Sequence, residues 1–309
     1  MPFCILLVCL LHSSNAIGQQ KQVCFTMDDM PVVSYGITDT NYQKTLFNNL
    51  LQSFCRYHIP VTGFVISKKL YTETGIDSFQ VRLLEDWLNR GLDLGNHTYS
   101  HPDFNAVTLK DYVWNIEQGE PVLKQLLAGN GKMLKYFRHP YLHVGNTKAK
   151  ADSLRDYLSI HQYTVAPVTI DNDDYLFAVV YKKARDKNDT ALMTRIGSDY
   201  IGYLEKKLRY YEQQSQHLFG RAISQILLFH ASALNSDYVD SLACMFQRNH
   251  YVFVSLDKAL EDDAYKTDVT SFGNYGISWL DRWALSQGKK GDFFKEDPVP
   301  PEYIMSLSK

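Results

Sequence analysis

The most constraining feature of this sequence is an alternation of short apolar runs with longer segments that carry apolar residues at helical spacing. The runs QVCFTM (22–27), VTGFVI (61–66) and ISQILLFHA (223–231) are bounded by polar or turn-forming residues, as buried strands are. Between the first two runs, apolar residues recur three and four positions apart over 42–57, which predicts an amphipathic helix. Strands that alternate with helices predict an α/β fold with a parallel sheet and helical crossovers.

The alternation continues to about residue 257. We expect further strands over 135–141, 163–171 and 251–256, and further helices over 79–90, 109–127, 154–161, 198–216 and 238–249. Pro121 should kink or weaken the helix over 109–127. The segment 268–309 lacks this rhythm, and we expect it to be an extension packed on a single domain that spans 19–267.

Composition excludes some classes of protein. The chain has 309 residues, of which 45% are hydrophobic, so large-scale disorder is not expected. A formal net charge of -2 without a basic block argues against a nucleic-acid partner, and nothing in the sequence predicts an oligomeric state. No later stretch is apolar for long enough to be a transmembrane helix.

The N-terminus, MPFCILLVCLLHSSNAIGQQ, has the pattern of a secretory signal peptide over 1–18, with cleavage near Ala16 or Gly18. Its apolar core is too short to span a bilayer, and no basic residue precedes Lys21. From the signal-peptide pattern we expect export to the periplasm or the extracellular space. The cysteines beyond it are odd in number and lack CxxC spacing, so neither a disulfide framework nor a zinc knuckle is expected; they are Cys24, Cys55 and Cys244.

Two polar clusters follow expected strands. The loop GNHTYSHPDF (95–104) places His97 and His101 four positions apart, so that both imidazoles can point at one metal ion. Asp28 and Asp29 end the first strand, where one carboxylate can bind a metal while its neighbour stays free as a base. Taken alone, the two clusters are more typical of surface histidines and of an acidic turn.

Five segments in order make the interpretation specific. FTMDDMP, GNHTYSHPDF, FRHPY, VTIDNDDY and ILLFH each follow an expected strand between about residues 22 and 257. Together they resemble the five motifs of the polysaccharide deacetylase family, the NodB-homology domain of carbohydrate esterase family 4. The resemblance implies one catalytic domain with an irregular (β/α) barrel and a site at the carboxyl ends of its strands.

The resemblance also implies a role for residues of the first three motifs. Asp28 would be the general base, and Asp29 would bind a divalent metal together with His97 and His101. Zinc is the expected metal, with cobalt or another divalent cation as alternatives; it would lower the pKa of a bound water and polarise the acyl oxygen. Arg138 would pair with the base and keep its carboxylate ionised.

The remaining roles fall on the last three motifs. The backbone N–H of Tyr141 would face the developing oxyanion, and His230 would be the general acid that protonates the leaving group. Asp174 would orient His230 and raise its pKa. Asp171 is a weaker candidate for that partner, and we expect Asp173 to face solvent.

Two positions depart from the family pattern, and two histidines lie outside it. Met30 stands where the family usually has glycine, which suggests a bulkier loop over the base, and Tyr175 stands where tryptophan is usual. His139 and His143 flank the third motif and are expected to be solvated loop residues that could touch substrate.

The function that these observations predict is metal-dependent removal of N-acetyl groups from amino sugars of a glycan, such as chitin-like oligomers or peptidoglycan. An acetylated carbohydrate is thus the expected partner. Two alternatives stay open. One is an O-acetyl esterase that acts on xylan, because the same groups hydrolyse esters; the other is a carbohydrate-binding relative without turnover.

Overall fold

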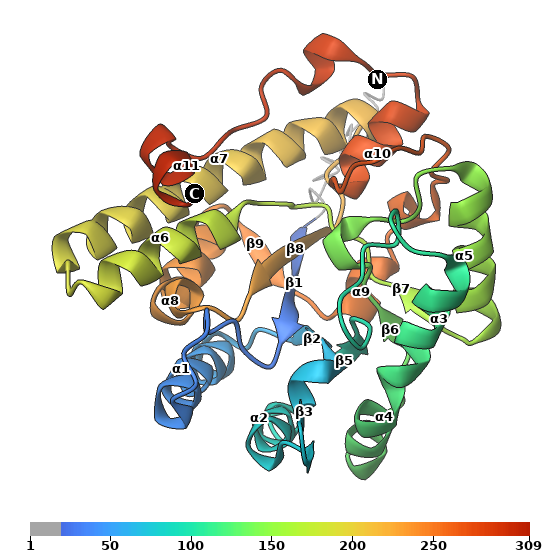
Figure 1. The fold of residues 1–309 in the computed structure, drawn as a ribbon. Helices are drawn as coiled ribbons and strands as arrows, with labels where there is room; N and C mark the ends of the chain where they lie inside the picture. The colour runs from blue at the N-terminus through green and yellow to red at the C-terminus, as the bar shows by residue number, and fades with distance from the viewer. Residues whose placement is uncertain (1–19) are drawn as a thin grey trace, which may run out of the picture.

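The computed structural model describes residues 20–309, so the expected signal peptide lies outside the described residues. Within that range a seven-stranded sheet has the order β7-β6-β5-β2-β1-β8, and β9 pairs with β1. Every pairing in this sheet is parallel, as the alternation predicted. The sheet curls into a half-barrel with helices around it (Figure 1).

The strands are β1 (Lys21–Met30), β2 (Val61–Val65), β3 (Tyr71–Thr72), β4 (Gly75–Ile76), β5 (Asp93–Asn96), β6 (Tyr136–Phe137), β7 (Thr164–Val165), β8 (Gln225–His230) and β9 (Tyr251–Phe253). The α-helices are α1 (Thr40–Tyr57), α2 (Ser78–Leu88), α3 (Leu109–Gln118), α4 (Glu120–Gly129), α5 (Lys148–Ile160), α6 (Asp174–Asp186), α7 (Thr190–Phe219), α8 (Ala233–Arg248), α9 (Leu256–Leu260), α10 (Trp279–Ser286) and α11 (Glu302–Leu307). Short 3-10 turns are η1 (Ser67–Leu70), η2 (Pro140–Leu142), η3 (Asp263–Lys266) and η4 (Gly291–Phe294).

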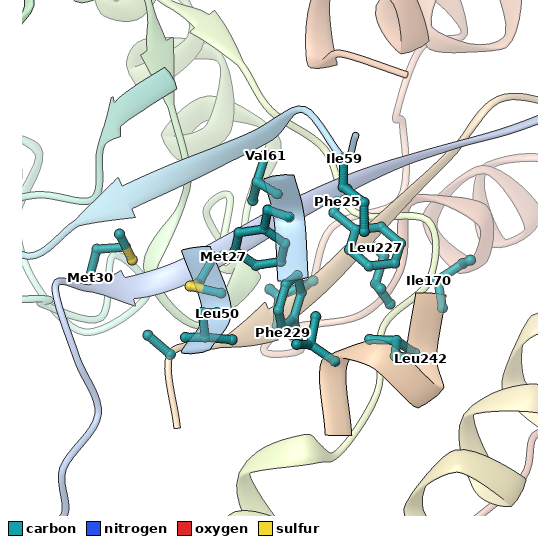
Figure 2. Packing of buried hydrophobic residues seen from close by; sticks show 14 of the residues in the cluster. Phe25, Met27, Met30, Leu50, Ile59, Val61, Ile170, Leu227, Phe229 and Leu242 are labelled. Carbon is teal, nitrogen blue, oxygen red and sulfur yellow. The ribbon is translucent and has the colours of Figure 1, made fainter. Parts of the chain in front are cut away.

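The core is built around β1, which pairs with β2, β8 and β9, and around its neighbour β8. Phe25 of β1 makes edge-on contacts with Phe229, Phe246 and Phe253 at ring-centroid distances of 5.5, 5.3 and 5.2 Å. Figure 2 shows Phe25 and Phe229 among the aliphatic side chains of the same cluster. Because helices cover this sheet, its central strands are buried along most of their length and mostly apolar, so they can be recognised in the sequence as apolar runs.

The helix expected over 109–127 is two helices. α3 ends at Gln118 and α4 begins at Glu120, with Gly119 as the cap between them, so Pro121 lies in the first turn of α4. Proline is tolerated there because its missing N–H would have no intrahelical partner. Gly119 also leaves no room for a side chain, since an added Cβ would lie 2.8 Å from Asn96 Oδ1.

Other expected elements differ in extent. The strand expected over 163–171 is only β7, followed by a single bridge between Ile170 and Leu227. α6 was not expected at all, and α7 extends beyond the predicted 198–216 at both ends. These two helices run side by side (Figure 1).

The segment 268–309 contains α10 and α11 and contacts the rest of the chain. The backbone N–H of Trp279 donates to Val168 O at 2.7 Å, and Ser278 Oγ donates to Thr169 O at 2.8 Å. Trp283 is buried in the main cluster. The boundary placed at 267 stays a prediction. Among the described residues, the helices are all too short or too polar to cross a membrane.

Candidate active site

A cavity of about 610 Å³ opens at the carboxyl ends of the strands. This edge is where parallel α/β sheets collect functional groups, because strand ends and the loops after them converge there. The cavity is lined by Asp28, Asp29, His97, His101, Tyr141, Leu142, His143, Asp171, Asn172, Asp173, Tyr175, Leu228, His230 and Gly276. The side chains of the first, second and fifth predicted motifs thus meet at one place.

Asp29, His97 and His101 form a compact donor set. Asp29 Oδ1 lies 3.4 Å from His97 Nε2 and 3.5 Å from His101 Nε2, and one donor atom from each residue lies within 4.8 Å of the others. Ligands held about 2.0–2.1 Å from one tetrahedral ion are about 3.3–3.5 Å apart. Asp29 Oδ1 is also buried without a hydrogen-bond partner among residues 20–309. The set therefore fits a divalent cation.

The protonation states suit metal binding. Burial, and then the charge of His97, lower the pKa of His101 to about 3. Burial alone would raise the pKa of Asp29, but the nearby imidazoles, that of His97 first, lower it below its usual range. His97 Nδ1 lies 2.9 Å from Arg138 O, and since a carbonyl only accepts, the lone pair of a neutral His97 is on Nε2.

The loop that carries the two histidines is fixed by side-chain hydrogen bonds. Thr98 and His101 have φ of 67° and 57°, a conformation that non-glycine residues keep only when their surroundings enforce it. Asn96 Oδ1 accepts from Thr98 N at 2.7 Å, and Thr98 Oγ1 accepts from His101 N at 3.0 Å. Asn115 Oδ1 accepts from Ser100 N at 2.9 Å, so α3 also holds the loop.

Asp28 lies beside this donor set. Its side chain is buried, with Oδ2 3.8 Å from His97 Nε2 and 3.4 Å from Arg138 Nη1. Arg138 also donates to Thr26 Oγ1 at 2.8 Å and lies over the ring of Phe64 at 4.6 Å. A buried guanidinium favours the ionised form of a neighbouring carboxyl group. Asp28 Oδ1 has no partner among residues 20–309 and stays available to accept a proton.

Lys69 holds the backbone of the aspartate pair, and sequence reasoning missed it. Its Nζ donates to Asp29 O at 2.5 Å and to Val32 O at 3.1 Å. Asp29 itself has φ of 60°, so these contacts support a left-handed turn at the metal ligand. Lys69 belongs to no motif, and only its burial in the structure reveals the role.

His230 lines the same cavity as the donor set. It is the register partner of Asp28 in the parallel pairing of β8 with β1, so the two side chains leave neighbouring strand ends. Its Nδ1 lies 2.8 Å from Asp174 Oδ1. Burial alone would lower the pKa of His230, but the carboxylate of Asp174, with smaller effects of Asp29 and Asp28, raises it to about 10. Asn235, also missed by sequence reasoning, donates to Asp174 Oδ2 at 2.7 Å.

Tyr141 and Leu142 form a strained turn in η2. Their φ values are 56° and 53°, and the ring of Tyr141 lies 4.5 Å from that of His101. In the part of the chain that the structure describes, the Tyr141 N–H donates to no protein acceptor. This N–H is thus available to a ligand in the cavity, although the Tyr141 side chain is 56% exposed.

Two of the other acidic residues of the fourth motif also line the cavity. Burial raises the pKa of Asp171 to about 7. The expectation that Asp173 faces solvent is wrong, because its Oδ2 accepts the hydroxyl of Tyr203 at 2.7 Å. The reason is the packing of α7 beside the motif, which the predicted helix over 198–216 did not reveal.

The two histidines of the third motif are not solvated. His139 is buried, and burial lowers its pKa to about 3. His143 lines the cavity, and its Nδ1 lies 2.6 Å from Asp103 Oδ1. Met30 does not bulk out the loop over Asp28 either, because its side chain packs into the core cluster (Figure 2). Tyr175 lines the cavity with half of its surface exposed.

Comparison with known proteins shows a similarity to one family over part of the chain. The model of the polysaccharide deacetylase family matches residues 16–158. No curated protein matches the chain. Solved structures of similar fold include a mutant of the peptidoglycan deacetylase PdaC from Bacillus subtilis, which is 18% identical over 80% of this chain and 94% of that one, with a TM-score of 0.51.

Two further structures have the same fold. One is a mutant of a CE4 family pseudoenzyme with restored enzymatic activity, 14% identical over 78% of this chain and 68% of that one, with a TM-score of 0.51. The other is a peptidoglycan N-acetylglucosamine deacetylase in complex with an N-oxidanyl-benzamide, 16% identical over 78% of this chain and 88% of that one, with a TM-score of 0.50.

At these identities the likeness concerns the fold, and it confirms the predicted (β/α) barrel of the NodB type. The family model accounts for the first three motifs, since its match ends at residue 158. The match over residues 16–158 and the shared fold together make this chain similar to the polysaccharide deacetylase family.

Proposed function

We propose that this chain is a metal-dependent hydrolase that removes N-acetyl groups from amino sugars of a glycan, either chitin-like oligomers or peptidoglycan. The observation that carries the proposal is the donor set of Asp29, His97 and His101, with Asp28 and His230 in the same cavity. A base, an acid and a cation site in one cavity are the parts that amide hydrolysis by water needs.

The metal would be held by Asp29, His97 and His101, and zinc suits this combination of nitrogen and oxygen donors. When bound, such a cation lowers the pKa of a coordinated water and polarises an acyl oxygen. Cobalt or another divalent cation could take the same place.

The chain's own residues supply the proton transfers. Asp28 would accept the proton of the attacking water, with Arg138 holding the carboxylate in place. The Tyr141 N–H would donate to the oxyanion that forms when water adds to the acetyl carbonyl. His230 would then give its proton to the sugar nitrogen, because an amine leaves only after protonation. Asp174 would orient His230 in this step.

The products are acetate and a free amine, and the sequence of steps needs no covalent intermediate with the enzyme. The proposal includes one catalytic domain over 19–267 and export, to the periplasm or the extracellular space, by the signal peptide expected at 1–18. Two of the structures of similar fold are named peptidoglycan deacetylases, which supports a glycan of that class as substrate.

The test is acetate release by the purified protein from chitooligosaccharides, peptidoglycan and acetylated xylan, each with and without a chelator. We expect acetate from the N-acetylated glycans, its loss with chelator, and its return with zinc or cobalt. Release from xylan alone would replace the proposal by the esterase. Glycan binding without acetate release, even with metal restored, would replace it by a binding protein, an outcome in line with the pseudoenzyme of similar fold.

A further inference from the structure

The five motifs assign no role to the segment after residue 267, yet part of it lies at the cavity. Gly276 is one of the lining residues, and Arg282 is fully buried behind it. Both contact the turn at Tyr141 and Leu142, which lies about 135–140 residues earlier in the chain. The segment 275–282 thus joins the far end of the chain to the third motif.

The turn at Tyr141 and Leu142 needs support from outside. Two successive non-glycine residues with φ of 56° and 53° are a sterically unfavourable combination. Such a backbone persists only where neighbouring groups hold it in place. Within the turn itself, Leu142 N donates to His139 O at 3.0 Å, and this bond leaves the Leu142 carbonyl to a partner elsewhere.

Arg282 supplies that partner. Its Nη2 donates to Leu142 O at 2.7 Å and to Tyr275 O at 3.0 Å. The guanidinium lies over the rings of Tyr275 and Trp279, at 5.3 and 5.4 Å. No salt bridge of Arg282 occurs among residues 20–309, so carbonyl groups and aromatic faces are what this buried cation contacts.

Gly276 makes the second contact. An added Cβ at this position would lie 1.9 Å from Tyr141 O, far inside any allowed contact. The requirement for glycine here is one of space, because the backbone must pass directly over the Tyr141 carbonyl. That carbonyl and the N–H of Tyr141 lie in adjacent peptide units joined at the Tyr141 Cα, so holding the carbonyl in place restricts φ and ψ of Tyr141 and with them the direction of its N–H.

The segment 275–282 is itself fixed to the barrel. The backbone N–H of Trp279 donates to Val168 O, and Ser278 Oγ donates to Thr169 O. Both acceptors are buried, and they are the first two residues of the fourth motif, shortly after β7. The segment can therefore transmit the rigidity of the barrel to the turn.

We propose that the segment 275–282 sets the orientation of the Tyr141 N–H, with Arg282 as a positioning residue and Gly276 as the point of closest approach. This inference rests on the proposed function, in which that N–H donates to the oxyanion. It gives the C-terminal extension a role in the reaction that no motif contains. Neither residue touches Asp29, His97 or His101 in any contact described above, so metal binding should not depend on them.

The test compares Arg282→Met, Arg282→Lys and Gly276→Ala with wild-type protein. We expect kcat for acetate release to fall about 10- to 100-fold in Arg282→Met and Gly276→Ala, with KM and zinc affinity within about twofold, because one oxyanion donor is misaligned. Arg282→Lys should recover part of kcat, since an ammonium can still reach one carbonyl. Amide hydrogen exchange of the peptide over 139–145 should be faster in the two impaired variants.

Matched controls are Gly202→Ala, where an added Cβ meets nothing within 4 Å, and Arg209→Met, an arginine at the surface. Both should keep wild-type kcat and wild-type exchange over 139–145. Gly276→Ala keeps the inference testable if Arg282→Met does not fold. Wild-type kcat and exchange in a folded Gly276→Ala would overturn the inference. A wild-type protein that releases no acetate would overturn the proposed function instead. Hydrogen exchange over 139–145 would still test whether Arg282 and Gly276 hold the turn in place.

Discussion

Asp174 binds His230 through both of its carboxylate oxygens. Oδ1 lies 2.8 Å from Nδ1 of the imidazole, and Oδ2 accepts the backbone N–H of His230 at 2.8 Å. Because a carboxylate only accepts, Nδ1 carries a proton and Nε2 is the atom left for a ligand in the cavity. Asp174 is fully buried and is the first residue of α6. These donors and the N-terminus of that helix therefore take the place of water around its carboxylate.

The first prediction concerns Asp174→Asn, which keeps the size of the side chain and removes its charge. The carboxylate is the main group that raises the pKa of His230 against the effect of burial, so this pKa should fall. We expect kcat on N-acetylated oligomers to drop about 10²- to 10⁴-fold and the alkaline limb of its pH profile to move to lower pH. Asp186→Asn, at the exposed end of α6, should leave the profile unchanged. An unshifted limb in Asp174→Asn would exclude His230 as the acid.

The raised pKa of His230 also predicts how stability varies with pH. The folded state holds the proton more tightly than the unfolded state, whose histidine pKa is about 6.5. The resulting stabilisation is complete below that value and is lost as pH rises through about 10. In metal-free protein, the difference in free energy of unfolding between wild type and His230→Gln should therefore shrink from neutral to alkaline pH. A difference that is constant with pH would contradict this.

The grouping of the main site residues could be predicted from the sequence for a physical reason. Strands buried on both faces give continuous apolar runs, and the ends of parallel strands meet at one edge. Asp28 and His230, about 200 residues apart, become register partners because their runs form adjacent strands. The structure brings Asp29, His97 and His101 together as well, and their roles stay predictions.

The supporting residues could not be predicted, because no local pattern marks them. Lys69 acts through the length of its side chain, and Arg282 through a contact with a residue 140 positions earlier in the sequence. α6 begins at Asp174 inside the fourth motif, where VTIDNDDY suggests a strand followed by a loop. The wrong expectation for Asp173 has a similar cause. The sequence does not show that Tyr203 of α7 packs beside the fourth motif.

A second prediction concerns the metal. His101→Ala removes one of three donors, so the variant should lose bound zinc, whereas wild-type protein should bind about one ion per chain by metal analysis after dialysis. Zinc should also raise the free energy of unfolding of wild-type protein by about 3 kcal/mol at a hundredfold excess over Kd, and should not stabilise the variant. His143→Ala is the matched control, because His143 lines the same cavity outside the donor set. Equal zinc content in both variants would contradict the assigned site.

A third prediction concerns Arg138, which is fully buried beside Asp28. Arg138→Met leaves the Asp28 carboxylate without its cationic neighbour and Thr26 Oγ1 without its donor. Breaking a buried ion pair from one side costs about 3–5 kcal/mol, and we expect a loss of stability of that order in urea unfolding. Arg155→Met removes an exposed arginine and should change stability by less than about 0.5 kcal/mol. Similar values for the two variants would contradict a structural pairing of Arg138 with Asp28.

A fourth prediction separates amide from ester hydrolysis through His230. An amine must be protonated before it leaves, whereas an activated alcohol such as p-nitrophenol leaves as the anion, so only the amide reaction depends strongly on a general acid. His230→Ala should therefore reduce acetate release from chitooligosaccharides about 10²- to 10⁴-fold and reduce hydrolysis of p-nitrophenyl acetate less than about tenfold. Both reactions should still stop when a chelator is added, which shows that the ester is hydrolysed at the same site. If the variant kept activity on acetylated xylan and wild-type protein had none on chitooligosaccharides, the O-acetyl esterase would be the better assignment. An equal fall in both reactions would mean that His230 positions the substrate rather than supplying the proton.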